Sequence, residues 1–322
     1  MLRECLEVIP ASVGELRYEI IVVDNNSTDG SVEMVREFFP KIKLLVNQSN
    51  LGFPKAVNQG IRESTGEFLA LVNSDIILAA GQLEGLAKHL ISHEHVGAAG
   101  PQLISPGGHF QYSGGYAPSV KTALNQFIGI QLLVGARTRS VFVRLKTSEP
   151  LSVDWICGAC VLIRSAAVKQ TGYFDEAHFM YAEDVDYSLR LKANGWKLYL
   201  LPEYRVVHLG GGSSNSEGSR IKLMWLGGIF RIAAQTLTNK EYILFGIFMS
   251  LSFWIRYTLI TMMNLLKIRK LLEVADKKDL INYGSAAFRL AFKGRGYATT
   301  FCQELEIEGY PSMRNESLNN ES

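Results

Sequence analysis

The sequence predicts an α/β fold in which a mostly parallel sheet is flanked by helices. Continuous apolar runs at residues 18–23, 68–72 and 96–100 are typical of strands that are buried on both faces. Segments with helical periodicity separate these runs. The first two runs end in short polar stretches, at residues 24–31 and 73–75. Such turns line the ligand crevice at the carboxyl edge of an open α/β sheet.

The composition limits the classes of protein that are possible. With 322 residues, 47% of them apolar, the chain can form one large domain, or one domain with an appendage. The net charge of +2 gives no field that would gather nucleic acid, so no nucleic-acid partner is expected. Cys157 and Cys160 have a redox or half-zinc spacing, but they lie in the apolar run WICGACVLI without a second pair. We expect a buried structural pair in a reducing compartment.

The elements follow from periodicity and from turn residues. Pro54 suits the first turn of a helix, and Gly195 suits a helix end. A Gly-, Pro- and Ser-rich stretch at 101–119 is interpreted as hairpins and loop, and residues 123–145 as a lid or an acceptor loop. The predicted helices are 2–8, 32–39, 54–64, 82–93 and 183–194, and the predicted strands are 18–23, 43–46, 68–72, 96–100, 153–164, 196–202 and 204–208.

The stretch FMYAEDVDYSLRLKANG at 179–195 carries the strongest chemical signal. Glu183, Asp184 and Asp186 lie within four residues, at the start of a predicted helix. The backbone dipole favours negative charge there. A helix start beside a cleft is also a suitable place for a general base. The alternative from these residues alone is a capped helix with surface acids.

Further spacing predicts how this helix packs. Val185, Leu189 and Ala193 recur every four residues and are expected to form one buried stripe. Asp186 and Arg190 are also four residues apart, so they can pair on another face.

Other polar residues stand where predicted strands end or helices begin. Asp24 could bind a ribose or a base edge, while Lys55 and Asn58 could face the crevice from the first turn of a helix. Asp75 ends a strand and could ligate a hard divalent cation that carries a diphosphate. His208 ends the last strand beside a glycine run, as a metal ligand can. The alternatives are helix caps, solvated side chains and a structural histidine.

Taken together, several stretches resemble the inverting glycosyltransferase family 2, especially its rhamnosyltransferase-like branch. The resemblance covers roughly residues 1–215. It rests on VVDNNSTDGS (22–31), NLGFPKAVNQGI (50–61), LALVNSD (69–75), VDWICGACVLIRSAAVKQTGYFDEAHFMYAEDVDYSLRLKANGW (153–196) and VVHLGGGSS (206–214).

This resemblance implies a glycosyltransferase A-type, Rossmann-like fold, a nucleoside-diphosphate sugar donor and a divalent metal, Mg²⁺ or Mn²⁺. It implies an inverting transferase that moves a sugar, with rhamnose as a candidate, to a saccharide or lipid-linked acceptor in cell-surface polysaccharide synthesis. The alternative is a catalytically inactive, membrane-associated nucleotide-sugar-binding protein. The implied roles are general base for Asp184, supported by Glu183; donor binding for Asp24, Asn26, Lys55, Asn58, Asn73 and Asp75; acceptor contact for Trp155 and Gly158; and metal binding for Asp75 and His208.

Two features depart from the family pattern. The metal motif has the amide of Asn73 in place of a carboxylate. The family also has a strand and a Tyr-Asn turn before the helix that starts here at Leu2. Without that strand, the neighbouring strands at 18–23 and 68–72 are expected to expose unpaired backbone and apolar side chains.

The resemblance and the composition give three regions: a catalytic domain at 1–215, a helical, membrane-associated region at 216–300, and a disordered tail at 301–322. Residues 242–266 exceed the roughly 20 residues that span a bilayer, but they include Arg256. Residues 256–295 include nine Lys or Arg residues and three Asp or Glu residues, which gives a net charge of +6. This charge favours a helix lying on an anionic cytoplasmic leaflet; a spanning helix and an ordinary packed helix are the alternatives. The expected location is the cytoplasmic face of the cell membrane, or otherwise the cytoplasm.

Overall fold

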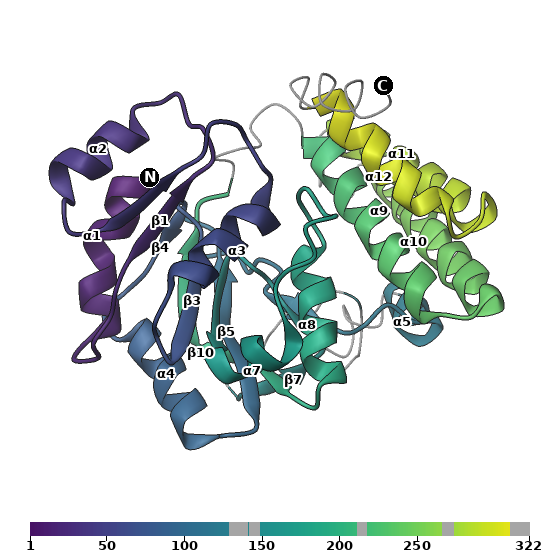
Figure 1. The fold of residues 1–322 in the computed structure, drawn as a ribbon. Helices are drawn as coiled ribbons and strands as arrows, with labels where there is room; N and C mark the ends of the chain where they lie inside the picture. The colour runs from purple at the N-terminus through teal and green to yellow at the C-terminus, as the bar shows by residue number, and fades with distance from the viewer. Residues whose placement is uncertain (129–140, 142–148, 211–217, 266–273, 310–322) are drawn as a thin grey trace, which may run out of the picture. The chain divides into compact units, whose positions relative to one another are not determined.

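The computed structural model describes residues 1–128, 141, 149–210, 218–265 and 274–309. The chain divides into two compact units (Figure 1). The first unit comprises Met1–Ala117 and Phe142–Asn215, and the second comprises Pro118–Val141 and Ser216–Ser322.

The first unit alternates helices and strands as an α/β fold does. Its helices are α1 (Leu2–Val13), α2 (Ser31–Phe38), α3 (Phe53–Glu63), α4 (Gln82–Ser92), α7 (Ser165–Thr171) and α8 (Glu183–Ala193). Its strands are β1 (Ile21–Asp24), β2 (Lys43–Val46), β3 (Phe68–Val72), β4 (Ile76–Ile77), β5 (Val96–Ile104), β6 (Gly114–Gly115), β7 (Leu151–Val153), β8 (Trp155–Ile156), β9 (Cys160–Arg164) and β10 (Lys197–His208).

The main sheet is mixed, which corrects the expectation of a mostly parallel one. Its order is β3-β9-β5-β10-β4, with β7 paired to β10. Only β5 and β10 are parallel neighbours in this sheet, because β9 runs antiparallel to both β3 and β5. The strand β1 pairs in parallel with β2 in a separate two-stranded sheet.

The strands β1 and β3 have fewer partners than strands inside a sheet. Within the described chain, β1 pairs only with β2 and β3 only with β9. Residues Ile21, Val22 and Val23 are therefore only half-buried, not buried on both faces as the apolar run predicted. Ala70 in the middle of β3 is exposed.

Helices cover both faces of the main sheet. Along β9, Leu162 joins a core cluster with Leu86 and Leu90 of α4. The next residue, Ile163, faces the opposite side and shares a small cavity with Tyr187 and Leu191 of α8. Because neighbouring residues of a strand point to opposite faces, the alternation in β9 supports α4 on one face and α8 on the other.

In two places the number of strands differs from the prediction. The single strand expected at 153–164 is three short strands, because β7 pairs with β10, β8 with β6, and β9 with β3 and β5. The two strands expected at 196–202 and 204–208 are one long strand, β10, with a register shift between Leu201 and Arg205.

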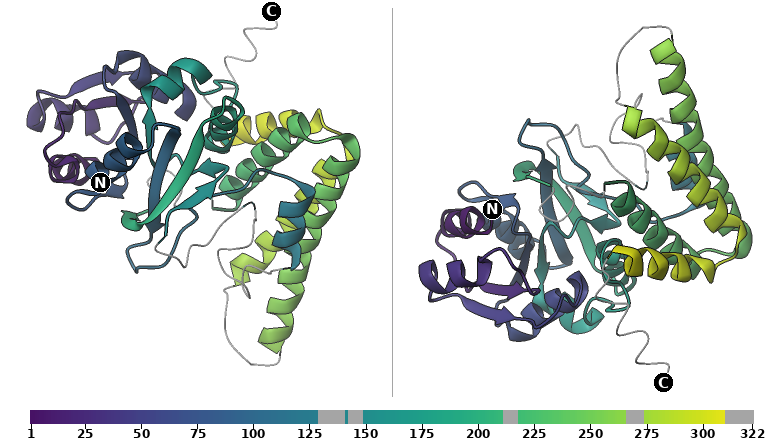
Figure 2. Two further views of the ribbon diagram at one scale, coloured as in Figure 1. Left: turned by 90° about the horizontal axis from the view of Figure 1, so that it is seen from below. Right: turned by 90° about the horizontal axis from the view of Figure 1, so that it is seen from above.

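The second unit is helical. Its helices are α5 (Val120–Ile128), α9 (Gly218–Thr236), α10 (Asn239–Leu265), α11 (Val274–Phe292) and α12 (Tyr297–Gly309). Helix α10 packs along α11 and α9 along α12 (Figure 2). Residues 301–309, expected in a disordered tail, belong to α12, and 310–322 lie outside the described residues. In the described ranges, no helix combines the length and apolar character of a bilayer span. Most of the lid or acceptor loop expected at 123–145 also lies outside the described residues.

Candidate active site

One acid and one imidazole meet where β3 and β10 end. Asp75 follows β3, and its Oδ2 lies 3.3 Å from the Nε2 of His208, the last residue of β10. Burial acts to raise the pKa of Asp75. The hydrogen bond and charge of His208, together with backbone N–H groups at Asp75 and Gly210, lower it below its ordinary value. Asp75 is therefore held as a carboxylate.

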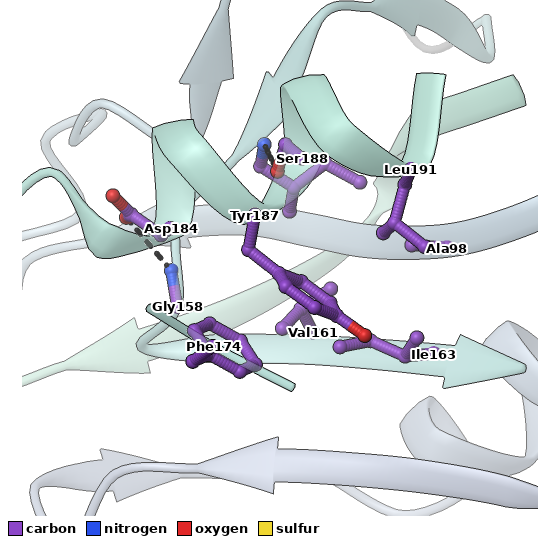
Figure 3. A pocket seen from close by; sticks show the side chains of 10 residues that line it. Ala98, Gly158, Val161, Ile163, Phe174, Asp184, Tyr187, Ser188 and Leu191 are labelled. Atoms are coloured by element: carbon purple, nitrogen blue, oxygen red, sulfur yellow. Dashed lines mark hydrogen bonds between the residues drawn. The ribbon is translucent and has the colours of Figure 1, made fainter. Parts of the chain in front are cut away.

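A second acidic group begins α8. Asp184 accepts a hydrogen bond from the backbone N–H of Gly158 at 3.0 Å (Figure 3). It accepts a second one from the backbone N–H of Val185 at 2.8 Å. Glu183 is only 7% exposed. Within the described part of the chain, its Oε2 has no hydrogen-bond partner. The adjacent acids thus sit in unequal surroundings.

These surroundings shift the pKa values of the two acids. Burial raises the pKa of Glu183, and the charge of Asp184 raises it further. Burial also raises the pKa of Asp184, but the N–H groups of Gly158 and Val185 oppose that change. We conclude that Glu183 is the acid of this pair that keeps a proton more readily, since burial and the neighbouring Asp184 both raise its pKa and its Oε2 accepts no hydrogen bond in the described part of the chain.

Figure 3 shows what lies behind the Asp184 carboxylate. The ring of Tyr187 stacks on Phe174 with centroids 4.0 Å apart. A cavity of about 10 Å³ remains beside these rings, between α8 and the sheet. This cavity has room for about one water molecule. It is therefore too small to bind a nucleotide sugar.

Two backbone hydrogen bonds place the two acidic groups at the same end of β3 and β9. The backbone N–H of Asn73, at the end of β3, donates to the carbonyl of Ala159 at 2.9 Å. Ala159 directly follows Gly158, whose N–H binds Asp184. These contacts link Asp184, through Gly158 and Ala159, to the end of β3 that precedes Asp75, whose side chain lies against His208.

The turn after β1 joins this arrangement through α3. The side chain of Asn25 donates to the carbonyl of Gly52 at 3.0 Å, and Phe53 N–H donates to the carbonyl of Phe179 at 2.8 Å. Gly52 has φ 85°, and a Cβ there would lie 2.6 Å from the Phe179 oxygen, so only glycine fits. This junction fixes the loop that leads into α8.

That loop is strained just before the acids. Tyr181 and Ala182 both have positive φ, 72° and 68°. Such conformations cost about 1–3 kcal/mol each and persist where the surroundings impose them. Here they orient the first turn of α8, which carries Glu183 and Asp184.

The remaining predicted donor-binding residues lie in different surroundings. Asp24 is buried, and its Oδ2 accepts from Ser27 N–H at 3.0 Å. Asn26 and Lys55 are exposed. Asn58 has no exposed surface, and its amide bonds to Phe174 and Glu176 tie α3 to that loop. We therefore assign a structural role to Asn58, in place of the expected donor contact.

The two predicted acceptor residues also differ. Gly158 contacts Asp184 directly, as described above. Trp155 belongs to β8 and is only 2% exposed, so the structure places it in the core of the unit. The predicted ion pair between Asp186 and Arg190 is confirmed, with Nε and Oδ2 2.9 Å apart.

Sequence reasoning missed three residues that support the site. Asn25 lies in the quoted strand-end motif, but its own role was not predicted. The thiol of Cys5 donates to the carbonyl of Asn73 at 3.6 Å. Gln111 contacts His208 with both atoms of its amide. No local pattern around Cys5 or Gln111 identifies them, because only the fold brings them to the site.

The model of glycosyl transferase family 2 matches residues 1–172, and that of glycosyl transferase family group 2 matches residues 108–272. The chain belongs to glycosyl transferase family 2. The first model alone covers more than half of the 322 residues. The predicted class, a glycosyltransferase, is confirmed.

Similar proteins point to one branch of the family. The chain is 31% identical over 202 residues to the N-acetylglucosaminyl-diphospho-decaprenol L-rhamnosyltransferase of Mycobacterium tuberculosis, covering 59% of this chain and 66% of that protein. It is 24% identical over 188 residues to rhamnosyltransferase WbbL of Escherichia coli (strain K12), covering 58% and 69%. The predicted rhamnosyltransferase-like branch is confirmed by these relatives.

A solved structure shares the fold. The mannosyltransferase PcManGT from Pyrobaculum calidifontis, in complex with GDP-Man and Mn²⁺, aligns with a TM-score of 0.56 at 15% identity. The alignment covers 91% of this chain and 82% of that one. This likeness shows the glycosyltransferase A-type α/β fold and nothing about the substrate.

Proposed function

We propose that this protein transfers a sugar, with rhamnose as the first candidate, from a nucleoside-diphosphate donor to a saccharide or lipid-linked acceptor. The reaction would serve cell-surface polysaccharide synthesis. The relatives that carry this proposal are rhamnosyltransferases, one of which is named for a diphospho-decaprenol substrate. The observation that supports it best is the position of Asp184 at the start of α8, where its Oδ2 accepts the backbone N–H of Gly158.

The proposed reaction is a single displacement at the anomeric carbon, which inverts its configuration. Asp184 takes the proton of the acceptor hydroxyl while that oxygen attacks. Each Asp184 oxygen accepts one backbone N–H and keeps further lone-pair capacity for the acceptor. Glu183, which holds its own proton, adds no second negative charge, so the acceptor meets one base.

The residues Asp75 and His208 fit a divalent cation. Their facing Oδ2 and Nε2 atoms, 3.3 Å apart, can share one ion, because Mg²⁺–oxygen and metal–imidazole bonds are about 2.0–2.1 Å long. Among the described residues, no group of three or more His, Cys, Asp or Glu side chains could hold a metal. The donor diphosphate and water therefore complete the proposed site. Mg²⁺ or Mn²⁺ bound there would neutralise the charge of the departing diphosphate.

The second candidate is a binding protein of the same fold without catalysis. The open edges of β1 and β3 favour it, because a nucleotide site beside unpaired strands is less firmly supported. A panel of nucleoside-diphosphate sugars, titrated first for binding and then tested for transfer with Mn²⁺ and lipid-linked acceptors, separates the two candidates. We expect both binding and turnover with a rhamnose donor. Binding without turnover for every donor and acceptor would select the second candidate.

We also propose that α10 and α11 lie on an anionic membrane surface. Exposed apolar side chains recur on one side of α10 and continue onto α11, where Trp254 and Phe288 stack with centroids 6.0 Å apart. Arg289 of α11 and Lys293, which directly follows this helix, are also exposed. Such a surface pairs apolar insertion with attraction to anionic lipid. The exposed apolar residues are Ile243, Leu244, Trp254, Ile255, Met262, Ile281, Phe288 and Phe292.

Sedimentation with lipid vesicles tests this surface. We expect the protein to bind phosphatidylglycerol vesicles and to bind phosphatidylcholine vesicles more weakly. Trp254→Ser combined with Phe288→Ser is expected to abolish sedimentation. Ile91→Ser is the control, because Ile91 lies on a helix of the first unit and is 54% exposed, more than Trp254 at 38% or Phe288 at 44%. Unchanged sedimentation of the double variant would contradict the proposal.

A further inference from the structure

The residue Gln111 lies outside every predicted motif, yet its side chain is committed to His208. Its Nε2 donates to the His208 carbonyl at 3.0 Å, and its Oε1 lies 2.7 Å from Nδ1 of the imidazole. Two atoms of one amide thus fix two atoms of one histidine.

The backbone around Gln111 is also fixed. Its N–H donates to the carbonyl of Leu103 in β5 at 2.9 Å. Its own carbonyl accepts from the side chains of Gln102 at 2.9 Å and Ser113 at 3.2 Å. Gln102 and Ser113 are each only 1% exposed. Gln111 is therefore held by the core of the first unit and can orient its partner.

This arrangement determines the tautomer of a neutral His208. Because the amide nitrogen faces the His208 carbonyl, the amide oxygen must face Nδ1. An amide oxygen only accepts hydrogen bonds, so Nδ1 carries the proton and Nε2 keeps its lone pair. That lone pair faces the carboxylate of Asp75. When the ring is protonated, Nε2–H donates to Asp75; when the ring is neutral, a divalent cation can take the place of that proton between the two acceptors.

We propose that Gln111 is a positioning residue for the metal site: it holds His208 in the tautomer whose bare Nε2 faces Asp75. The proposal rests on the proposed metal role of Asp75 and His208. An outer hydrogen bond to a metal-binding histidine fixes the ring and typically changes metal affinity about 10–100-fold.

The test measures Mn²⁺ affinity by calorimetry on the donor-free full chain. We expect Gln111→Ala to weaken Mn²⁺ binding by about 10–100-fold. Gln111→Glu keeps an acceptor for the Nδ1 proton, so it should bind Mn²⁺ more tightly than Gln111→Ala. Gln170→Ala is a matched control, because the Gln170 amide also bridges a backbone carbonyl, of Asn194, and a ring N–H, of Trp196. It should bind Mn²⁺ like the wild type.

A second readout needs no metal and no activity. In ¹⁵N spectra of the neutral ring, recorded at alkaline pH, His208 should carry its proton on Nδ1. Gln111→Ala should shift this population toward Nε2. Wild-type Mn²⁺ affinity in a folded Gln111→Ala variant would overturn the proposal while leaving the metal site standing. Absence of Mn²⁺ binding by the wild type would instead overturn the metal site itself.

Discussion

The two acidic regions of the first unit hold carboxylates under opposite conditions. Asp75 faces an imidazole, and its pKa is lowered. Glu183 is buried beside Asp184 with one oxygen unpaired, and its pKa is raised. One region is thus suited to hold a cation and the other to hold and accept protons. A carboxyl group can serve in both regions, because its neighbours determine whether it is charged.

The largest expected effect is on turnover, and it distinguishes a catalytic base from a structural acid within α8. Asp184→Asn should lower turnover by about 10²–10⁴-fold, the usual contribution of a general base. Donor and Mn²⁺ affinities should stay near wild type, because Asp184 is not part of the metal pair. Asp186→Asn is the matched control, since Asp186 pairs with Arg190 on the same helix. Turnover by Asp184→Asn at the wild-type rate would remove Asp184 from this role.

The next effect is on the cation. Asp75→Asn keeps the shape of the side chain and removes its charge, so Mn²⁺ should bind more weakly by at least the roughly 10–100-fold typical of losing an outer partner. Excess Mn²⁺ should then restore part of the turnover. The same excess should not rescue Asp184→Asn. If added metal rescued neither variant, or both, the two regions would not have the separate roles assigned here.

The smallest effect concerns stability and pH. The pKa of Glu183 is raised above its ordinary 4.5 in the folded protein, so folding favours the protonated form. Its contribution is fully present below the unfolded pKa and is lost as pH rises toward the folded pKa. The slope reaches at most about 1.4 kcal/mol per pH unit.

Urea unfolding at several pH values between about 5.5 and 8.5 measures this slope. Glu183→Gln should remove this part of the pH dependence and become the more stable variant at the alkaline end. Parallel stability curves for the wild type and Glu183→Gln across this range would contradict the raised pKa.

The sequence predicted the elements of the first unit better than their partners. The apolar run at 68–72 became β3 with the predicted bounds. The direction of its neighbour could not be predicted, because β9 comes from residues about a hundred positions later. The stripe expected from Val185, Leu189 and Ala193 was also wrong. Ala193 is exposed, and α8 buries Val185, Ser188 and Leu191 at a spacing of three.

In the candidate site, too, positions at the ends of elements were predicted better than the contacts between elements. Asp75, Asp184 and His208 were predicted because each stands at the end of a recognisable element. Gln111 was not, because its role depends on a contact across 97 residues. Asn58 was expected to face the crevice, but in the folded unit its side chain bonds to the loop at Phe174. Sequence patterns therefore give an element and its end, whereas the facing partner comes from the tertiary structure.

The most direct test of the central claim, that the metal pair and the base share one site, is paramagnetic broadening by Mn²⁺. The full chain with Mn²⁺ bound is compared with the same chain with Mg²⁺, by amide resonances. We predict that Gly158 and Val185, which bind Asp184, broaden more strongly than Arg164, at the opposite end of β9. Stronger broadening at Arg164 than at Gly158 would contradict the claim.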